Sequence, residues 1–173
     1  VTVTCSNTAP EVGPITAPLD PRLINASISA SAVFTDADQM DSHTAVWDWG
    51  DNQMSAGTIT EANGFDTVND THSYTSAGVY TITLTVTDDE GHSDESFFNY
   101  VVIYDPDGFV TGGGWYDSPV GAYVDTEITG QANFGFNIKY KNNATIPTGQ
   151  TNFNFQEANL HFQSTDYDWL VII

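Results

Sequence analysis

The stretch "VWDWGDNQ", Val46–Gln53, places two tryptophans two positions apart and follows them with a glycine, an aspartate and an asparagine. Side chains two residues apart on a β-strand project to the same face, so Trp47 and Trp49 are predicted to point together into the interior. Paired large rings on one sheet face are typical of a β-sandwich core. Residues 50–52 tolerate left-handed backbone angles and predict a turn, with Asp51 capping its amides. We therefore expect a structural element and not an aromatic-walled catalytic cleft.

Period-two alternation of apolar and polar residues continues through most of the chain, and helical periodicity is nearly absent. The clearest strand is predicted over residues 79–87, "VYTITLTVT", where Tyr80, Ile82, Leu84 and Val86 alternate with threonine. Further strands are predicted over residues 26–34 and 96–104, and the "DDEGH" run before the latter reads as a turn. The expected fold class is all-β.

The stretch "DPDG", residues 105–108, interrupts this pattern with proline and glycine between acids, which indicates a linker. We expect a leader strand or linker over residues 1–7, a sandwich over 8–105 and a smaller or C-terminally incomplete β module over 106–173. In that module, strands are predicted at residues 109–116, 131–140, 150–156, 158–164 and in the final "DWLVII". "GGGW", residues 112–115, is interpreted as a strand start that needs close backbone approach. The ragged apolar ends lead us to expect a piece of a longer protein.

The charge of the chain is lopsided, with 23 Asp and Glu against three Lys and Arg and a net charge of −20. Such a surface repels the phosphates of nucleic acids and anionic lipids, so we expect no nucleic-acid partner. No stretch approaches the ~20 apolar residues that span a bilayer. Two explanations of the charge are equally good: a solvated acidic coat, or carboxylates that hold divalent cations.

Residues 8–104 closely resemble a polycystic-kidney-disease-type (PKD) domain, which is an immunoglobulin-like β-sandwich. The resemblance rests on "VFTDAD" (33–38), "VWDWGD" (46–51) and "HSYTSAGVYTITLTVTDDEG" (72–91), with a small departure at Gln53. It implies that Tyr74 and Tyr80 are corner tyrosines and that the chain is secreted or on the cell surface. The second part resembles a β-rich, GGGW-containing module that follows PKD domains in secreted prokaryotic proteins.

Three acids in "DADQMDSH" supply hard oxygens from one loop, the ligands that Ca²⁺ prefers. By the resemblance, the N-terminal linker adds donors to this loop, and the acids after the strand that ends at Thr87 form a weaker second group. The candidate Ca²⁺ ligands are Asp36, Asp38, Asp41, Asn7, Thr8, Asp88 and Asp89. An acidic turn without metal is the alternative.

No catalytic pattern stands out, so we expect no enzyme. The four histidines lack zinc-ligand spacing, no G-x-S-x-G occurs, and the single cysteine, Cys5, lies in the leader. The sequons at Asn25, Asn69 and Asn143 permit N-glycosylation and are weak support for a surface location.

The function expected first is a non-catalytic accessory module of a larger secreted protein, serving as a spacer or in adhesion or protein–protein interaction, with neighbouring domains as partners. One alternative is a surface-filament subunit, in which the leader strand of one copy completes the open sheet of another. Another is a carbohydrate-binding module that uses the exposed aromatics Trp115 and Tyr116, with a polysaccharide as its partner.

Overall fold

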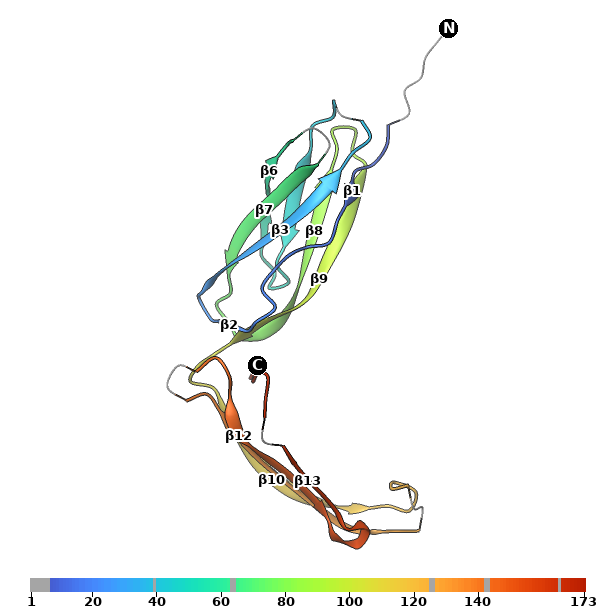
Figure 1. Cartoon of the computed structure of the whole chain (residues 1–173), viewed down its shortest axis with the longest axis vertical. Helices are drawn as coiled ribbons and strands as arrows, with labels where there is room; N and C mark the ends of the chain where they lie inside the picture. Colours follow the sequence, from blue (N-terminus) through green and yellow to red (C-terminus); the bar gives the residue numbers. More distant parts are fainter. Residues whose placement is uncertain (1–6, 39, 63–64, 125–126, 142–143, 165) are drawn as a thin grey trace. The chain divides into compact units, whose positions relative to one another are not determined.

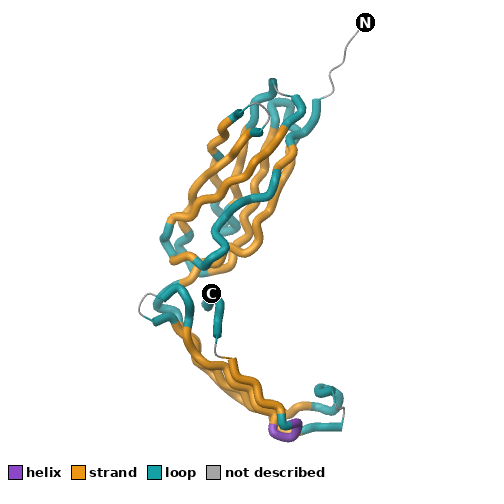
Figure 2. Tube along the Cα trace, in the orientation of Figure 1, coloured by secondary structure: helices purple, strands orange, loops and turns teal. Residues whose placement is uncertain are grey.

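The computed structural model describes residues 7–38, 40–62, 65–124, 127–141, 144–164 and 166–173. These residues form strands and turns, with a short 3₁₀ turn, η1, at Gln156–Ala158 (Figures 1 and 2). The chain divides into two compact units, Val1–Ile103, called the first unit, and Tyr104–Ile173, called the second unit. Among the described residues no helix is long and apolar enough to cross a membrane. Residues 1–6 of the leader expected over residues 1–7, and the sequon asparagine Asn143, lie outside the described residues.

The first unit is a sandwich of two sheets (Figure 1). One sheet has the order β1 (Glu11–Val12), β3 (Ser27–Thr35), β7 (Asp66–Ser73) and β6 (Thr58–Thr60). The other has the order β2 (Arg22–Leu23), β9 (Ser93–Tyr104), β8 (Gly78–Thr87), β4 (Thr44–Asp48) and β5 (Met54–Ala56). The β3–β7, β4–β8 and β8–β9 pairs are antiparallel. The fold class is all-β, as predicted.

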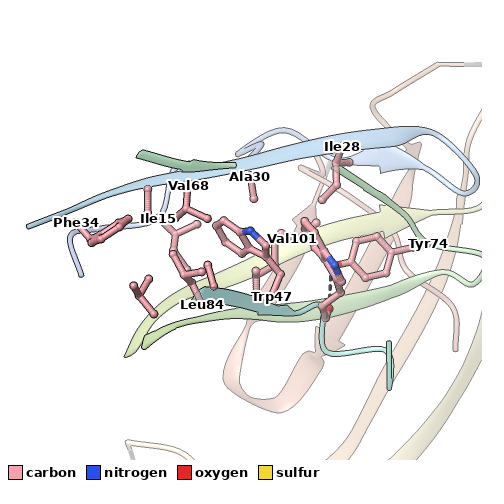
Figure 3. Packing of buried hydrophobic residues seen from close by; sticks show 14 of the residues in the cluster. Ile15, Ile28, Ala30, Phe34, Trp47, Val68, Tyr74, Leu84 and Val101 are labelled. Atoms are coloured by element: carbon pink, nitrogen blue, oxygen red, sulfur yellow. Dashed lines mark hydrogen bonds between the residues drawn. The ribbon is translucent and has the colours of Figure 1, made fainter. Parts of the chain in front are cut away.

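The core lies between the two sheets and follows the period-two pattern. Trp47 and Trp49 are fully buried, and their rings stack with centroids 5.6 Å apart. Figure 3 shows Trp47 and Leu84 of one sheet facing Ala30 and Val68 of the other. Burying an aromatic side chain removes roughly 150–250 Å² from water, which is about 4–6 kcal/mol of hydrophobic stabilisation per ring at ~25 cal/mol per Å². The prediction that both indoles face the opposing sheet is confirmed.

The turn after β4 adopts the left-handed angles that the sequence predicts. The φ angles are +77° at Gly50 and +66° at Asn52. Asp51 Oδ1 accepts a 3.1 Å hydrogen bond from the Gln53 amide, and the Trp49 amide donates to the Gln53 carbonyl at 3.1 Å. These bonds satisfy the turn internally and close the end of the β4–β5 pair.

The second unit contains a four-stranded antiparallel sheet in the order β10 (Phe109–Ser118), β11 (Gly130–Lys139), β12 (Thr148–Phe155) and β13 (Leu160–Ser164). Phe134, Phe153 and Phe162 lie opposite one another across three strands. One face of this sheet is apolar, and the register places on it Val110, Tyr116, Phe134, Phe136, Ile138, Phe153 and Phe162.

The glycines of "GGGW" lie inside β10 and not at its start. A Cβ on Gly112 would sit 2.7 Å from the Phe136 ring, and one on Gly114 would sit 3.2 Å from the Phe134 ring. On the other face, a Cβ on Gly113 would sit 2.8 Å from the carbonyl oxygen of Phe134. The expected close approach is therefore present, and it involves side-chain rings as well as backbone.

The prediction of a strand in "DWLVII" is wrong, because residues 166–173 form no strand. The hydroxyl of Tyr140 accepts a 2.8 Å hydrogen bond from the Leu170 amide and donates a 3.0 Å bond to the Leu170 carbonyl. The hydroxyls of Tyr167 and Thr151 lie 2.8 Å apart. Side chains thus satisfy polar groups that a neighbouring strand would otherwise pair.

Candidate metal centre

Three segments far apart in sequence meet at one end of the sandwich (Figure 1). The loop after β3 and the turn after β8 both begin there. β1 pairs with the end of β3, with Glu11 opposite Thr35, which carries the residues before β1 to the same end. The Val12 amide donates a 2.8 Å hydrogen bond to Asp94 Oδ2 of β9, so the N-terminal segment is bound to both sheets of the sandwich.

Five carboxylates gather at this end in two overlapping groups. One ligand oxygen from each of Asp36, Asp38 and Asp41 lies within 4.8 Å of the others, and the same holds for Asp41, Asp88 and Glu90. Oxygens that bind one Ca²⁺ at 2.3–2.6 Å lie at most about 5 Å apart. Both groups therefore have the spacing and the hard-oxygen chemistry that Ca²⁺ requires, and Asp41 belongs to both.

The carboxylates at this end are partly withdrawn from water. The side chains of Asp36 and Asp88 are 2% and 0% exposed. Asp41 Oδ2 is buried, and within the described part of the chain it has no hydrogen-bond partner. Leaving a buried polar oxygen unpaired costs free energy that a bound cation would recover. This orphaned oxygen fits a metal ligand better than it fits an ordinary turn residue.

The N-terminal segment contacts both carboxylate groups. The Thr8 amide donates a 2.8 Å hydrogen bond to Asp38 Oδ2. Asn7 Nδ2 donates a 2.8 Å bond to Asp88 Oδ2 and lies 2.8 Å from His92 Nδ1. The predicted candidates Asn7, Thr8, Asp38 and Asp88 are therefore brought together, although Thr8 contributes its backbone amide and Asn7 its amide nitrogen.

Local hydrogen bonds hold the loop after β3 in shape. The Asp38 amide donates to Asp36 Oδ1 at 2.8 Å, and the Asp41 amide donates to the Asp38 carbonyl at 3.0 Å. His43 Nε2 lies 3.1 Å from Asp36 Oδ2, and the His43 ring packs edge-on against Phe34. The histidine thus anchors the base of the loop to the core.

The electrostatics of the cluster differ from one acid to the next. Burial, followed by the charges of Asp89, Asp38, Asp36 and Asp88, raises the pKa of Asp41. A hydrogen bond that the protonated Glu90 carboxyl shares with Asp89, followed by burial, raises the pKa of Glu90. Burial also works to raise the pKa of Asp88, but donors from His92, Asn7 and Gly91 outweigh it, and the pKa is lowered. Asp88 is therefore held as a carboxylate, while Asp41 and Glu90 resist ionisation.

Sequence reasoning selected Asp89 and missed Glu90. Within the described residues Asp89 belongs to neither carboxylate group, and it contacts the cluster through its hydrogen bond with Glu90 and through its charge. The turn bends at Gly91, whose φ is +91°, and Asp88 accepts the amide of His92 at 2.8 Å. The "DDEG" run revealed three acids, but only this turn geometry decides which two face Asp41.

The polar groups around the paired indoles are structural. Trp49 Nε1 donates to Ser55 Oγ at 2.8 Å, and this hydroxyl donates to Asp70 at 2.5 Å. His72 lies 2.8 Å from Asp51 and stacks on Trp49 with centroids 4.9 Å apart. Asp70 thus holds the Ser55 hydroxyl and Asp51 holds the His72 imidazole, and both groups contact the Trp49 indole.

The remaining predicted site residues lie at the surface. Trp115 and Tyr116 are consecutive on β10, so they project to opposite faces of the sheet of the second unit and cannot stack on the same ligand ring. The sequon asparagines Asn25 and Asn69 are both exposed.

Comparison with known proteins gives a family for the first unit. Residues 7–103 match the family model described as "PKD domain". The PKD domain of an M14-like peptidase from Thermoplasmatales archaeon SCGC AB-540-F20 is 20% identical, with 57% of this chain and 98% of that chain covered and a TM-score of 0.48. The PKD1 domain of Vibrio anguillarum Epp is 31% identical, with coverage of 57% and 99% and a TM-score of 0.41. The PKD1 domain of the Vibrio cholerae metalloprotease PrtV is also 31% identical, with coverage of 56% and 99% and a TM-score of 0.41.

No curated protein matches the chain. The PKD family is one of non-catalytic modules within larger proteins. Because the family model spans more than half of its residues, the chain belongs to the PKD domain family.

Proposed function

We propose that the first unit is a Ca²⁺-binding, non-catalytic accessory domain of a secreted or cell-surface protein, in which the ion fixes the N-terminal segment to the sandwich. The observation that carries this proposal is the buried Asp41 Oδ2, which has no hydrogen-bond partner among the described residues and lies where two carboxylate groups overlap. Asn7 and Thr8 already contact Asp88 and Asp38 beside it. An ion there joins the linker side of the domain to both sheets.

The residues that would hold the ion are Asp36, Asp38, Asp41, Asp88 and Glu90, with Asn7 as a neutral donor. Bound Ca²⁺ would supply positive charge that offsets the mutual repulsion of these acids. The side-chain amide of Asn7 offers either an oxygen or a nitrogen to the cluster, depending on its rotation. The protein's own part is to preassemble the carboxylates through the hydrogen bonds of the loop and the turn.

An extracellular location suits such a site. Extracellular Ca²⁺ modules bind with dissociation constants of about 10⁻⁴–10⁻³ M, which requires the higher Ca²⁺ concentrations found outside cells. The net charge of −20 also favours cations near the surface. The domain would then act as a spacer whose linker becomes stiff on the outside of the cell.

Thermal unfolding of the full chain in CaCl₂, MgCl₂ and EGTA tests this proposal. Ca²⁺ at ten times its dissociation constant adds about 1.4 kcal/mol. For a domain near 100 residues this raises the unfolding midpoint by roughly 5–10 °C. Asp38→Asn should remove most of the shift. Asp20→Asn is the matched control, because it changes the net charge by the same amount at an exposed position, and it should retain the shift. An equal shift in both variants, or none in the wild type, would overturn the proposal.

Amide hydrogen exchange tests the stiffening itself. Ca²⁺ should slow exchange at the Thr8 and Val12 amides, which bond to Asp38 and Asp94. Amides of β11, in the second unit, serve as an internal control and should not respond. A raised midpoint without slower exchange at residues 7–12 would retain the Ca²⁺ site and reject its role in fixing the linker.

A further inference from the structure

The sheet of the second unit has an apolar face, and its opposite face carries an array of amide side chains. Thr111, Asn137 and Gln150 form one row across β10, β11 and β12. The register gives a second row that begins with Gly113 on β10 and a third that begins with Trp115. We call this side the amide face, after the amide side chains in these three rows, Asn133, Asn137, Gln150, Asn152, Asn154 and Gln163.

These amides are available for binding. Five of the six residues are exposed and Asn152 is half-buried. None of the six makes a side-chain hydrogen bond to another residue in the described part of the chain. Each amide offers two donors and an acceptor, so the face can both donate to and accept from the same ligand group.

The charge of the amide face sets it apart from the rest of the molecule. The chain has 23 acids, yet among the β10–β13 positions that the register places on this face the one acid is Asp117, at its margin. Lys139 lies at the other end. Acids keep the rest of the surface solvated and would do so here as well. Uncharged amides instead can form hydrogen bonds with the uncharged hydroxyl groups of a ligand.

The second row leaves a strip along the middle of the face without side chains from β10 and β11. It contains Gly113 opposite Gly135, followed by Asn152 and Gln163. A Cβ on Gly113 would approach the Phe134 carbonyl oxygen to 2.8 Å, so this position is restricted to glycine, whereas a Cβ on Gly135 would lie no closer than 3.8 Å to the Gly112 carbonyl oxygen. Rows on one face repeat about every 6.7 Å, so the flanking rows stand about 13 Å apart, which leaves room for a flat sugar ring.

Two hollows lie at the end of the sheet that carries Lys139. A cavity of about 610 Å³ is lined by Thr111, Asn137 and Lys139 together with the residues that precede β10. Another of about 420 Å³ is lined by Asn137, Lys139, Thr148 and Gln150. The amide face is therefore recessed next to its amide side chains.

Two exposed aromatic rings mark the ends of the face. Trp115 is 62% exposed and Phe109 is 66% exposed, and both project to the amide side of β10. Six residues of strand separate them by about 20 Å, which is the length of a short oligosaccharide. The electron-rich face of an aromatic ring attracts the slightly positive C–H groups on one face of a pyranose.

We propose that the amide face binds a neutral polysaccharide chain that lies along β10. Trp115 stacks on one sugar ring, and the amides of Asn133, Asn137 and Gln150 bind hydroxyl groups of neighbouring rings. The net charge of −20 disfavours anionic glycans. A peptide would pair with a sheet edge and not with this face. The site is in the second unit and does not depend on the Ca²⁺ proposal for the first.

Affinity electrophoresis of the full chain in soluble xylan, mannan, β-glucan and hydroxyethyl cellulose tests the proposal, with pull-down on insoluble chitin and cellulose beside it. The wild type should bind at least one of these, and isothermal titration with the matching oligosaccharides should give the dissociation constant. Trp115→Ala and the double change Asn137→Ala with Gln150→Ala should each weaken binding at least tenfold. Tyr116→Ala removes an aromatic side chain from the adjacent position on the opposite face and should bind as the wild type does.

Circular dichroism and the unfolding midpoint confirm that each variant is folded, and Asn137→Asp supplies a second variant that keeps the side-chain volume. Binding should persist in EGTA, so that failure of the Ca²⁺ proposal leaves it unchanged. Absence of binding to the whole panel would overturn the proposal. So would equal losses in the Trp115 and Tyr116 variants, or binding to a peptide library and to none of the glycans.

Discussion

The hydroxyl of Tyr74 donates a 2.8 Å hydrogen bond to the backbone carbonyl of Trp49, and both side chains are buried. This bond ties the corner that leads into β8 to the turn that follows β4. The Tyr74 ring also stacks on Tyr80, with centroids 4.2 Å apart. The aromatic and acidic residues around Trp49 are thus linked to one another by packing and hydrogen bonds, which gives them a structural role.

Tyr74→Phe should destabilise the first unit by about 1–3 kcal/mol, because the Trp49 carbonyl loses its buried partner. Tyr80→Phe is the matched control. Its hydroxyl donates to the Ser76 carbonyl at 3.0 Å near the surface, where water replaces the bond. Urea unfolding followed by fluorescence should show a loss for Tyr74→Phe and less than about 0.5 kcal/mol for Tyr80→Phe. Equal losses would show that the corner bond has no special role.

Alkaline pH should weaken the first unit through the same tyrosine. Burial, followed by the charge of Asp51, raises the pKa of Tyr74 above its ordinary value of 10.0. The folded chain therefore keeps a proton that the unfolded chain loses, so the stabilisation is complete below pH 10 and is lost as the pH rises further. Between pH 9 and 11 the midpoint should fall more steeply in the wild type than in Tyr74→Phe. Parallel slopes would contradict this assignment.

The sandwich could be predicted because its signals are local. A two-residue spacing places Trp47 and Trp49 on one face whatever lies opposite them, and both are fully buried. The run that includes Ile82 and Leu84 follows the same rule, and these residues are fully buried as well. Likewise, the alternating phenylalanines of the second unit predict one apolar face, and Phe134 and Phe153 lie directly opposite each other.

What the sequence left out depends on backbone geometry and on contacts between distant segments. Tyr100 has a φ of +74° at an irregularity in the β8–β9 pairing, and tyrosine seldom adopts such left-handed angles. Glu90 is turned toward Asp41 by the bend at Gly91. The amide face emerges only when the register of four strands is known, since each amide alone resembles an ordinary exposed residue.

Gly57→Ala should destabilise the core by overpacking. A Cβ at this position would lie 2.5 Å from Val68 Cγ2 and 3.0 Å from both Ala45 Cβ and Trp47 Nε1. Inserting a methyl group into a filled core costs about 1–3 kcal/mol. Val68→Ala removes the closest atom, so the double variant should be more stable than the sum of the single losses by about 1 kcal/mol. Additive losses in urea unfolding would contradict a direct clash.

Asp41 and Asp88 should respond to loss of charge in opposite directions when Ca²⁺ is absent. Because the pKa of Asp41 is raised in the folded state, ionisation of this side chain lowers stability as the pH rises above its ordinary value of 3.8. The pKa of Asp88 is lowered, so its ionisation adds stability above the ordinary value, and that stability is lost as the pH falls through the folded pKa.

At pH 7 in EGTA, Asp41→Asn should therefore raise the unfolding midpoint, because it removes repulsion from the neighbouring acids. Asp88→Asn should lower the midpoint, because the Asn7 and His92 donors lose their carboxylate. In CaCl₂ both variants should fall below the wild type, since each lacks a proposed ligand. For Asp41→Asn the sign of the effect thus reverses with the ion. A pure turn residue would change stability in the same direction under both conditions, so calorimetry of this one variant with and without Ca²⁺ separates a metal ligand from a structural acid.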